Sequence, residues 1–200
     1  MAQQIEKEIR KTSFGVTLRA EEDLPMVEGY ALLFNTPSDG LPFVEVIEKG
    51  ALYGVIERSN VFALLNHDYQ RGILARSKQG KGTLSLEIDE KGLLYRFQPP
   101  KTALGEELLE YLKRGEITES SFAFTVADEV WERDGENMKR TIKAIEQLYD
   151  VSPVYDAAYS ATTVYARSFE EAKKEFEEKE KEEKRRELEA YYAEINKHLI

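Results

Sequence analysis

The sequence predicts an α+β protein in which a body built mainly of β-strands is followed by a long helical tail. Between residues 13 and 165, short apolar stretches alternate with turn signals. One amphipathic stretch, residues 102–113, interrupts them with helical periodicity. After residue 168 the chain contains no Gly or Pro and consists mainly of Glu and Lys. We therefore expect a folded body at residues 1–167 and a charged helical tail at 168–200.

The expected strands follow alternating or continuous apolar patterns bounded by turn residues. They are residues 13–20, 28–34, 61–66, 82–88, 93–98, 117–130, 140–149 and 157–165. Residues 43–47 are either a short strand or the lead into a turn and a short helix at 51–57. The sequence Asp89-Glu90-Lys91-Gly92 is typical of a turn, so we expect residues 82–98 to form a hairpin.

The longest helix expected inside the body spans residues 102–113. Its leucines share one face at helical spacing: Leu104, Leu108, Leu109 and Leu112. Gly115 follows as a candidate C-cap, because glycine adopts the left-handed conformation that ends many helices.

The tail is expected to form one helix from residue 168 to about 196. Ser168 is a candidate N-cap, and Glu171 completes a capping box. Acid-first i, i+4 pairs support the helix: Glu175/Lys179, Glu177/Lys181, Glu180/Lys184 and Glu182/Arg186. Its middle lacks an apolar stripe and is expected to be exposed. The tail is therefore either a solvated helix or a partner-binding or dimerising arm gripped at its apolar ends, Phe169, Ala172 and Phe176, and Leu188, Tyr191, Tyr192 and Ile195.

Composition excludes several kinds of chemistry. The chain has no Cys and two His far apart, so we expect no disulfide, no thiolate nucleophile and no metal site. No Gly-rich phosphate loop is present, and we expect no cofactor. The formal net charge of −10 argues against nucleic-acid binding. No apolar run approaches the roughly 18 residues that span a membrane, and the charged N-terminus does not resemble a secretory signal.

His67 ends an apolar run in the stretch ALLNHDYQ and is the only histidine in the first 197 residues. It is either a structural group at a strand end or a catalytic base. If the strand continues, His67 shares the face of Ala63 and Leu65, and Asp68 points the other way. Asp68 is therefore a poor partner for the ring, and an orienting acid has to come from elsewhere.

Two further residues are candidates for such chemistry. Phe122 and Phe124 alternate with small residues, which places Ser121 on the small-residue face and aims Ser120 at the core. Asp150 lies in an apolar setting, where an acid is costly to bury unless it is paired. An imidazole N–H is one suitable partner. The alternative is an aspartate that caps a turn before Pro153.

The order of these segments resembles the tailed-phage prohead protease family, which is related in fold and mechanism to the herpesvirus assemblins. The resemblance covers residues 14 to 167 and is carried by these segments in order: GYALLFN, the F-x-E-x-I stretch leading into KGAL, LLNHD, GTLSLEIDEKGLLYRF, a helix, GEITESSFAF and LYDVSPVYDAAY. It implies a mostly antiparallel, barrel-like β body with a few surface helices. The family signature Pro-Ala-Tyr-Pro stands here as Ala157-Ala158-Tyr159-Ser160.

The resemblance also implies a catalytic triad. The family's histidine falls on His67, its nucleophilic serine on Ser121 and its acidic member on Asp150. The residue before the nucleophile is usually bulky and apolar in the family, whereas here it is Ser120, so the pattern alone leaves two serines open. Backbone N–H groups or an arginine, such as Arg71 or Arg76, are candidates for stabilising the oxyanion.

By its family role, the chain is expected to be a serine endopeptidase that cleaves the scaffolding part of the major capsid protein, and itself, during prohead maturation. It would work in the host cytoplasm inside the immature capsid, and a homodimer or higher oligomer is compatible with the sequence. The alternative is a noncatalytic scaffold or capsid-binding module on the same fold. An esterase-like hydrolase is less favoured, because no G-x-S-x-G motif occurs.

Overall fold

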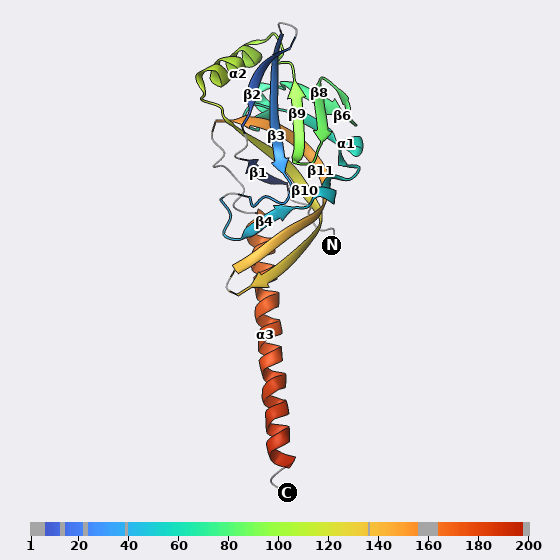
Figure 1. The fold of residues 1–200 in the computed structure, drawn as a ribbon, viewed down its shortest axis with the longest axis vertical. Helices are drawn as coiled ribbons and strands as arrows, with labels where there is room; N and C mark the ends of the chain where they lie inside the picture. Colours follow the sequence, from blue (N-terminus) through green and yellow to red (C-terminus); the bar gives the residue numbers. More distant parts are fainter. Residues whose placement is uncertain are drawn as a thin grey trace. The chain divides into compact units, whose positions relative to one another are not determined.

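The computed structural model describes residues 7–12, 15–21, 24–38, 40–135, 137–155 and 164–197. The chain divides into two units, residues 1–162 and 163–200. The first unit holds the strands and short helices, and the second holds the long helix α3 (Figure 1). The assignment of a protease role to the first unit and a separate role to the tail stays a prediction.

Within the described residues, the strands form one sheet of seven and one of four. The larger sheet has the order β1-β10-β11-β5-β6-β7, and β4 also pairs with β11. Its strands are β1 (Glu8–Thr12), β4 (Val44–Ile47), β5 (Asn60–Ala63), β6 (Ala75–Lys78), β7 (Lys81–Gly82), β10 (Glu119–Asp134) and β11 (Asn137–Val154). The pairs of β4 and β5 with β11 are parallel, and the other pairs are antiparallel.

The smaller sheet has the order β2-β3-β9-β8 and is antiparallel throughout. Its strands are β2 (Thr17–Glu21), β3 (Leu24–Leu33), β8 (Leu84–Ile88) and β9 (Gly92–Phe97). The predicted hairpin is confirmed, and its turn has a clear cause. The Asp89 carboxylate accepts hydrogen bonds from the N–H groups of Lys91, at 2.7 Å, and Gly92, at 2.9 Å.

Both sheets contribute to one hydrophobic core. Phe122 and Phe124 of β10 stack with ring centroids 4.9 Å apart, and both are almost fully buried. Leu93 and Phe97 of β9 belong to the same cluster. Apolar residues at alternate positions of the strands therefore meet between the sheets, and the opposite face of β10 is left for small and polar residues.

The α+β class is confirmed, but the barrel-like body fits only in part. Within the described residues, neither sheet closes on itself: β1 and β7 end the path of one, and β2 and β8 end that of the other. The sequence did not predict β1, β6 or β7, because these strands are short and rich in charged or small residues. Of the predicted strand at 157–165, residues 157–163 lie outside the described part of the chain, and 164–165 belong to α3.

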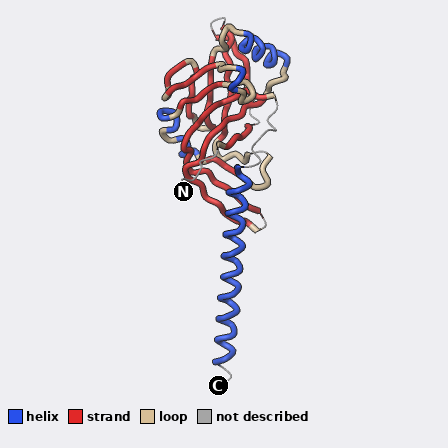
Figure 2. The backbone as a smooth tube through the Cα atoms, turned by 180° about the vertical axis from the view of Figure 1, so that it is seen from behind, coloured by secondary structure: helices blue, strands red, loops and turns tan. Residues whose placement is uncertain are grey.

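The helices of the body agree closely with the sequence analysis. The predicted helix is α2 (Ala103–Arg114), which lies outside the strands when the body is seen from behind (Figure 2). Thr102 caps it by accepting a hydrogen bond from the Gly105 N–H at 3.3 Å, and Gly115 ends it with φ of 71°. Residues 43–47 form a strand, and short helical turns follow: η1 (Lys49–Leu52) and α1 (Val55–Arg58). A further turn, η2 (Tyr69–Arg71), follows His67.

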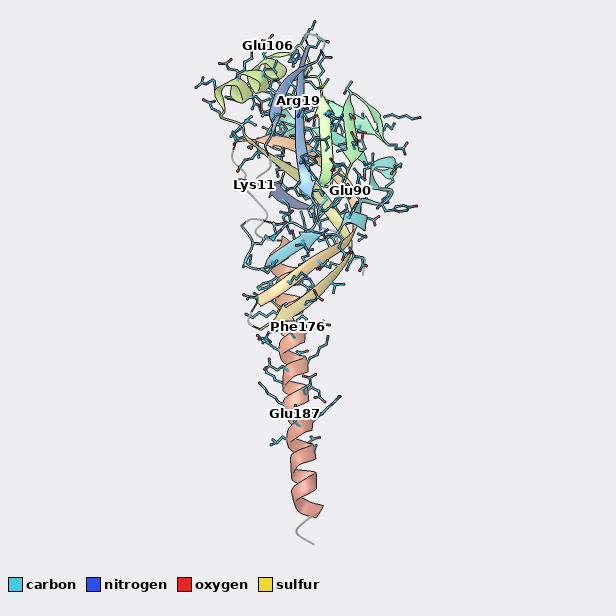
Figure 3. The ribbon with its side chains drawn as sticks, in the orientation of Figure 1. Lys11, Arg19, Glu90, Glu106, Phe176 and Glu187 are labelled. Atoms are coloured by element: carbon cyan, nitrogen blue, oxygen red, sulfur yellow. The ribbon has the colours of Figure 1, made fainter. Side chains whose placement is uncertain are left out.

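The tail is the helix α3 (Val164–Lys197), so it begins before Ser168, which is not its N-cap. The ion pairs Glu175–Lys179, Glu180–Lys184 and Glu182–Arg186 form as predicted. Its described side chains are mostly exposed, as Figure 3 shows around the labelled Glu187. Of the residues predicted to grip a partner at this end, Leu188 is 53% exposed. The side chains of Tyr191, Tyr192 and Ile195 lie outside the described part of the chain.

A buried ion cluster joins β1 and β4 to the long β10–β11 hairpin. It consists of Glu8, Arg10, Glu45, Glu129 and Arg140, and all but Glu129 are at most 5% exposed. Arg140 donates to both oxygens of Glu8 at 2.7 and 2.8 Å and to Glu45 at 2.9 Å. Arg10 donates to both oxygens of Glu45 at 2.6 and 2.8 Å. These bidentate contacts fix β1 on the body.

Removing one guanidinium from this cluster is expected to be strongly destabilising. Arg140→Met should lower the free energy of unfolding by about 3–5 kcal/mol, because it leaves the carboxylate of Glu8 buried without its main partner and takes one donor from the buried Glu45. The matched control is Arg114→Met, which breaks an exposed pair with Glu116 and should cost about 0–1 kcal/mol. Urea unfolding measures both, and equal losses in the two variants would contradict a structural role for the cluster.

The contribution of Glu8 to the free energy of unfolding should depend on pH. Burial raises the pKa of Glu8, but hydrogen bonds and charges from Arg140 and Arg10 outweigh burial and hold that pKa below its ordinary value. A carboxyl with a lowered folded pKa stabilises the protein above its unfolded pKa, about 4.3, and this contribution is lost as the pH falls through the folded pKa. The difference in free energy of unfolding between wild type and Glu8→Gln should therefore be largest near neutral pH and shrink below about pH 4. A constant difference would refute this linkage.

Candidate active site

Ser121 lies on β10 between two neighbouring strands, opposite Lys11 of β1 and Ser152 of β11. Lys11, the residue of β1 that pairs with Ser121, is labelled in Figure 3. The alternation along β10 holds here. Ser120 shares the core-facing side with Phe122 and exchanges a 2.8 Å hydrogen bond with the Tyr95 hydroxyl, while Ser121 projects from the opposite face. The two serines therefore have separate environments, and only Ser121 contacts the histidine.

His67 lies in a tight turn after β5, not on the strand face expected for it. The strand ends at Ala63, and the next residues run along β11, where the Asn66 N–H donates to the Pro153 carbonyl at 3.0 Å. Asn66 and His67 then adopt φ of 55° and 60°. Two successive non-glycine residues in the left-handed region are uncommon, and such strain is often found at functional sites. This turn places the imidazole next to Ser121 of β10 and Asp150 of β11.

The His67 ring lies between Ser121 and Asp150. Its Nε2 is 2.7 Å from the Ser121 Oγ, and its Nδ1 is hydrogen-bonded to the Asp150 Oδ1. The side chain of His67 is 17% exposed, whereas Asp150 is fully buried. An N–H on Nδ1 that donates to the carboxylate leaves the Nε2 lone pair to accept the serine hydrogen. The structure therefore brings together the three residues that the sequence analysis selected.

Asp150 accepts hydrogen bonds at both carboxylate oxygens. Besides His67, its Oδ1 accepts from the Ser152 hydroxyl at 3.0 Å. Its Oδ2 accepts from Lys7 Nζ at 3.0 Å and from the Tyr69 hydroxyl at 3.3 Å. Burial raises the pKa of Asp150, but the hydrogen bond and charge of His67, with those of Lys7, outweigh burial and hold that pKa below its ordinary value. The carboxyl group is therefore ionised at neutral pH.

The Ser121 hydroxyl has one hydrogen and two acceptors within reach. One is His67 Nε2, and the other is the backbone carbonyl of Arg10 on β1, at 2.8 Å. Ser121 is only 1% exposed. A peptide carbonyl can approach its Oγ only after part of the surrounding chain moves. The hydrogen-bonding geometry for proton transfer is present, while access for a substrate is closed in this arrangement.

The remaining candidate residues have other partners. Asp68 accepts from the Gln70 N–H at 2.9 Å and caps η2, so it does not orient the ring, as expected. Arg71 pairs with Glu107 on α2, and Arg76 donates to Asn60 Oδ1 at 2.7 Å. The arrangement thus offers no support for either arginine at the oxyanion. The segment 157–160, which stands where the resemblance would place Pro-Ala-Tyr-Pro, lies outside the described residues.

Sequence reasoning missed three groups around Asp150. Ser152 was available from the pattern, because residues two apart on a strand share a face. Tyr69 follows His67 closely, but only the turn brings its hydroxyl back to the carboxylate. Lys7 comes from the far end of the chain and had no local signal. Burial, followed by the charge of Asp150, raises the pKa of Tyr69, which keeps its hydroxyl protonated as a donor.

The described residues also bear on metal binding and on crossing a membrane. No group of three or more His, Cys, Asp or Glu side chains there is arranged to hold a metal ion. None of the helices in that part of the chain combines the length and apolar character needed to cross a membrane.

Comparisons with known proteins add independent information. The sequence model of a family described as caudovirus prohead serine protease matches residues 12–175, which is well over half of the chain. Among solved structures, the capsid assembly protease gp21 of bacteriophage T4 is similar, with a TM-score of 0.52 and 12% sequence identity. The match covers 77% of this chain and 99% of that one. None of the curated proteins compared with the chain matches it significantly in sequence.

Proposed function

Because this chain belongs to the caudovirus prohead serine protease family, we propose that it cleaves the scaffolding part of the major capsid protein, and itself, during prohead maturation. As a prohead protease it acts inside the immature capsid in the infected cell. The observation that best supports the proposal is the unbroken series of contacts from Asp150 through His67 to Ser121. This arrangement is what peptide hydrolysis by a serine requires.

In the proposed mechanism, Ser121 attacks the carbonyl carbon of the scissile peptide. The hydroxyl proton passes to His67 Nε2, which lies 2.7 Å from the oxygen, and a tetrahedral acyl adduct forms. His67 then gives this proton to the leaving amine, and an acyl-enzyme ester remains on Ser121. Water, deprotonated by the same ring, hydrolyses the ester and restores the serine.

Asp150 keeps the ring in the required tautomer and stabilises the imidazolium formed during each attack. Its lowered pKa fits this role, because the carboxylate has to stay charged while the ring gains a proton. Since Nδ1 faces Asp150, only Nε2 can exchange protons with Ser121 and with the leaving group.

The proposal is tested by expressing the chain together with the major capsid protein of its own phage. The wild-type chain should remove the scaffolding portion of that protein and shorten itself, and intact-mass spectrometry should locate both cuts. His67→Ala should leave both proteins at full length. If the wild type processes neither protein although the two assemble together, the noncatalytic capsid-binding alternative replaces this function.

A further inference from the structure

Ser152 is a fully buried residue of β11 that lies directly opposite Ser121 in the β10–β11 register. Its hydroxyl is 3.0 Å from Asp150 Oδ1 and 3.3 Å from His67 Nδ1. We propose that Ser152 is a positioning residue of the protease, which holds the Asp150 carboxylate and, through it, the His67 ring. This inference rests on the proposed function, and the mechanism described above does not use Ser152.

The first argument concerns the rotation of the Asp150 carboxylate. A carboxylate that receives donors at one oxygen can still turn about its terminal bond, whereas donors at both oxygens fix its plane. Lys7 and Tyr69 donate hydrogen bonds to Asp150 Oδ2, and Ser152 donates to Oδ1, the oxygen that faces the His67 ring. Lys7 is 35% exposed at its side chain and precedes strand β1. Ser152 is buried two residues from Asp150, so the β11 backbone itself sets its position.

The second argument concerns the hydrogen on His67 Nδ1. The Ser152 oxygen lies close enough to Nδ1 for the ring N–H to be shared between Asp150 Oδ1 and Ser152 Oγ. Two acceptors on this side favour the tautomer with hydrogen on Nδ1. That tautomer leaves Nε2 free to accept the Ser121 proton. Ser152 therefore acts on the tautomer and orientation of the ring without touching the substrate.

The direct test compares variants in proheads assembled from the chain and its capsid protein. Ser152→Ala should lower the first-order rate constant of scaffold cleavage about 10- to 100-fold, the range expected for losing a hydrogen bond to a charged group. Ser152→Thr keeps a hydroxyl and should recover most of the rate. The matched control is Ser77→Ala: Ser77 is also buried on a strand, and within the described residues its Oγ has no hydrogen-bond partner. This control should cleave like the wild type.

A double-mutant cycle separates positioning from a general packing effect. If Ser152 acts through Asp150, Ser152→Ala should have little further effect in the Asp150→Asn background, although it slows the wild type. If the fold-loss in rate of the double variant equals the product of the two single fold-losses, Ser152 does not act through Asp150, and the inference is overturned.

A spectroscopic readout keeps this inference distinct from the proposed function. The chain has two histidines, so the ring ¹⁵N signals of His67 are assigned by their loss in His67→Gln. Ser152→Ala should reduce the fraction of rings with hydrogen on Nδ1, and Ser77→Ala should not. A wild type that cleaves nothing would end the proposed function. A wild type that cleaves, with Ser152→Ala equal to Ser77→Ala in rate and tautomer, would end the role of Ser152.

Discussion

Ser121→Ala is expected to reduce the rate of scaffold cleavage roughly 10⁴- to 10⁶-fold while leaving the chain folded. Among the described residues, the Ser121 Oγ is the hydrogen-bond partner of His67 Nε2, at 2.7 Å, and the substitution removes it. No other described nucleophile lies on this ring nitrogen, so the loss should approach that of removing the whole triad. The measurement is the first-order disappearance of full-length capsid protein in proheads that contain the variant.

The matched control is Ser120→Ala, one residue away on the opposite face of β10. It breaks the hydrogen bond to the buried Tyr95 hydroxyl and should lower the free energy of unfolding by about 1–3 kcal/mol. Its cleavage rate should stay near that of the wild type under conditions where it is folded. Normal processing by Ser121→Ala would remove Ser121 from the mechanism. If a folded Ser120→Ala variant fails to process the capsid protein, Ser120 would be the nucleophile instead.

The two serines show where sequence reasoning was sufficient. Alternation with Phe122 and Phe124 separates the faces of Ser120 and Ser121 from the sequence alone, because successive side chains on a strand point to opposite faces. Helix α2 was equally accessible, since its cap residues Thr102 and Gly115 act within their own turns. In each case the physical cause lies within a few residues of its effect.

His67 shows why local reasoning could fail. The apolar run before Asn66 predicts a strand that continues through His67, whereas the strand ends at Ala63 and a turn sets the position of the ring. The actual turn depends on the Asn66 hydrogen bond to Pro153, a residue far along the chain. The family resemblance selected the histidine that contacts Ser121, but the left-handed backbone geometry that places its ring there depends on pairing with β11.

Strand β1 was missed for a different reason. Its sequence EIRKT is mostly charged, and charged side chains are usually exposed. Here Glu8 and Arg10 are the buried ones, because Glu45 and Arg140 complete their ion cluster. A charged residue whose partners are distant in sequence gives no local sign of burial. The Arg10 carbonyl at Ser121 and the Lys7 contact with Asp150 were hidden for the same reason.

Asp150→Asn is expected to slow scaffold cleavage about 10⁴-fold, although the new side chain has nearly the same size and shape as the carboxylate. The contacts around the carboxylate determine how the amide of Asn at this position would be oriented. Lys7 Nζ and the Tyr69 hydroxyl both donate to Oδ2, so the amide oxygen of the new side chain should take that position. Its NH₂ group then occupies the Oδ1 position, where Ser152 can turn to accept from it.

An NH₂ group facing His67 Nδ1 needs an acceptor there, so the ring hydrogen moves to Nε2. In that tautomer Nε2 cannot take the Ser121 proton, and the attack loses its general base. The variant should therefore fold and bind its capsid partner while its ¹⁵N spectrum shows hydrogen on Nε2. The control is Asp68→Asn, whose carboxylate caps η2 and does not orient the ring. A cleavage rate for Asp150→Asn within tenfold of that for Asp68→Asn would show that Asp150 does not set the tautomer.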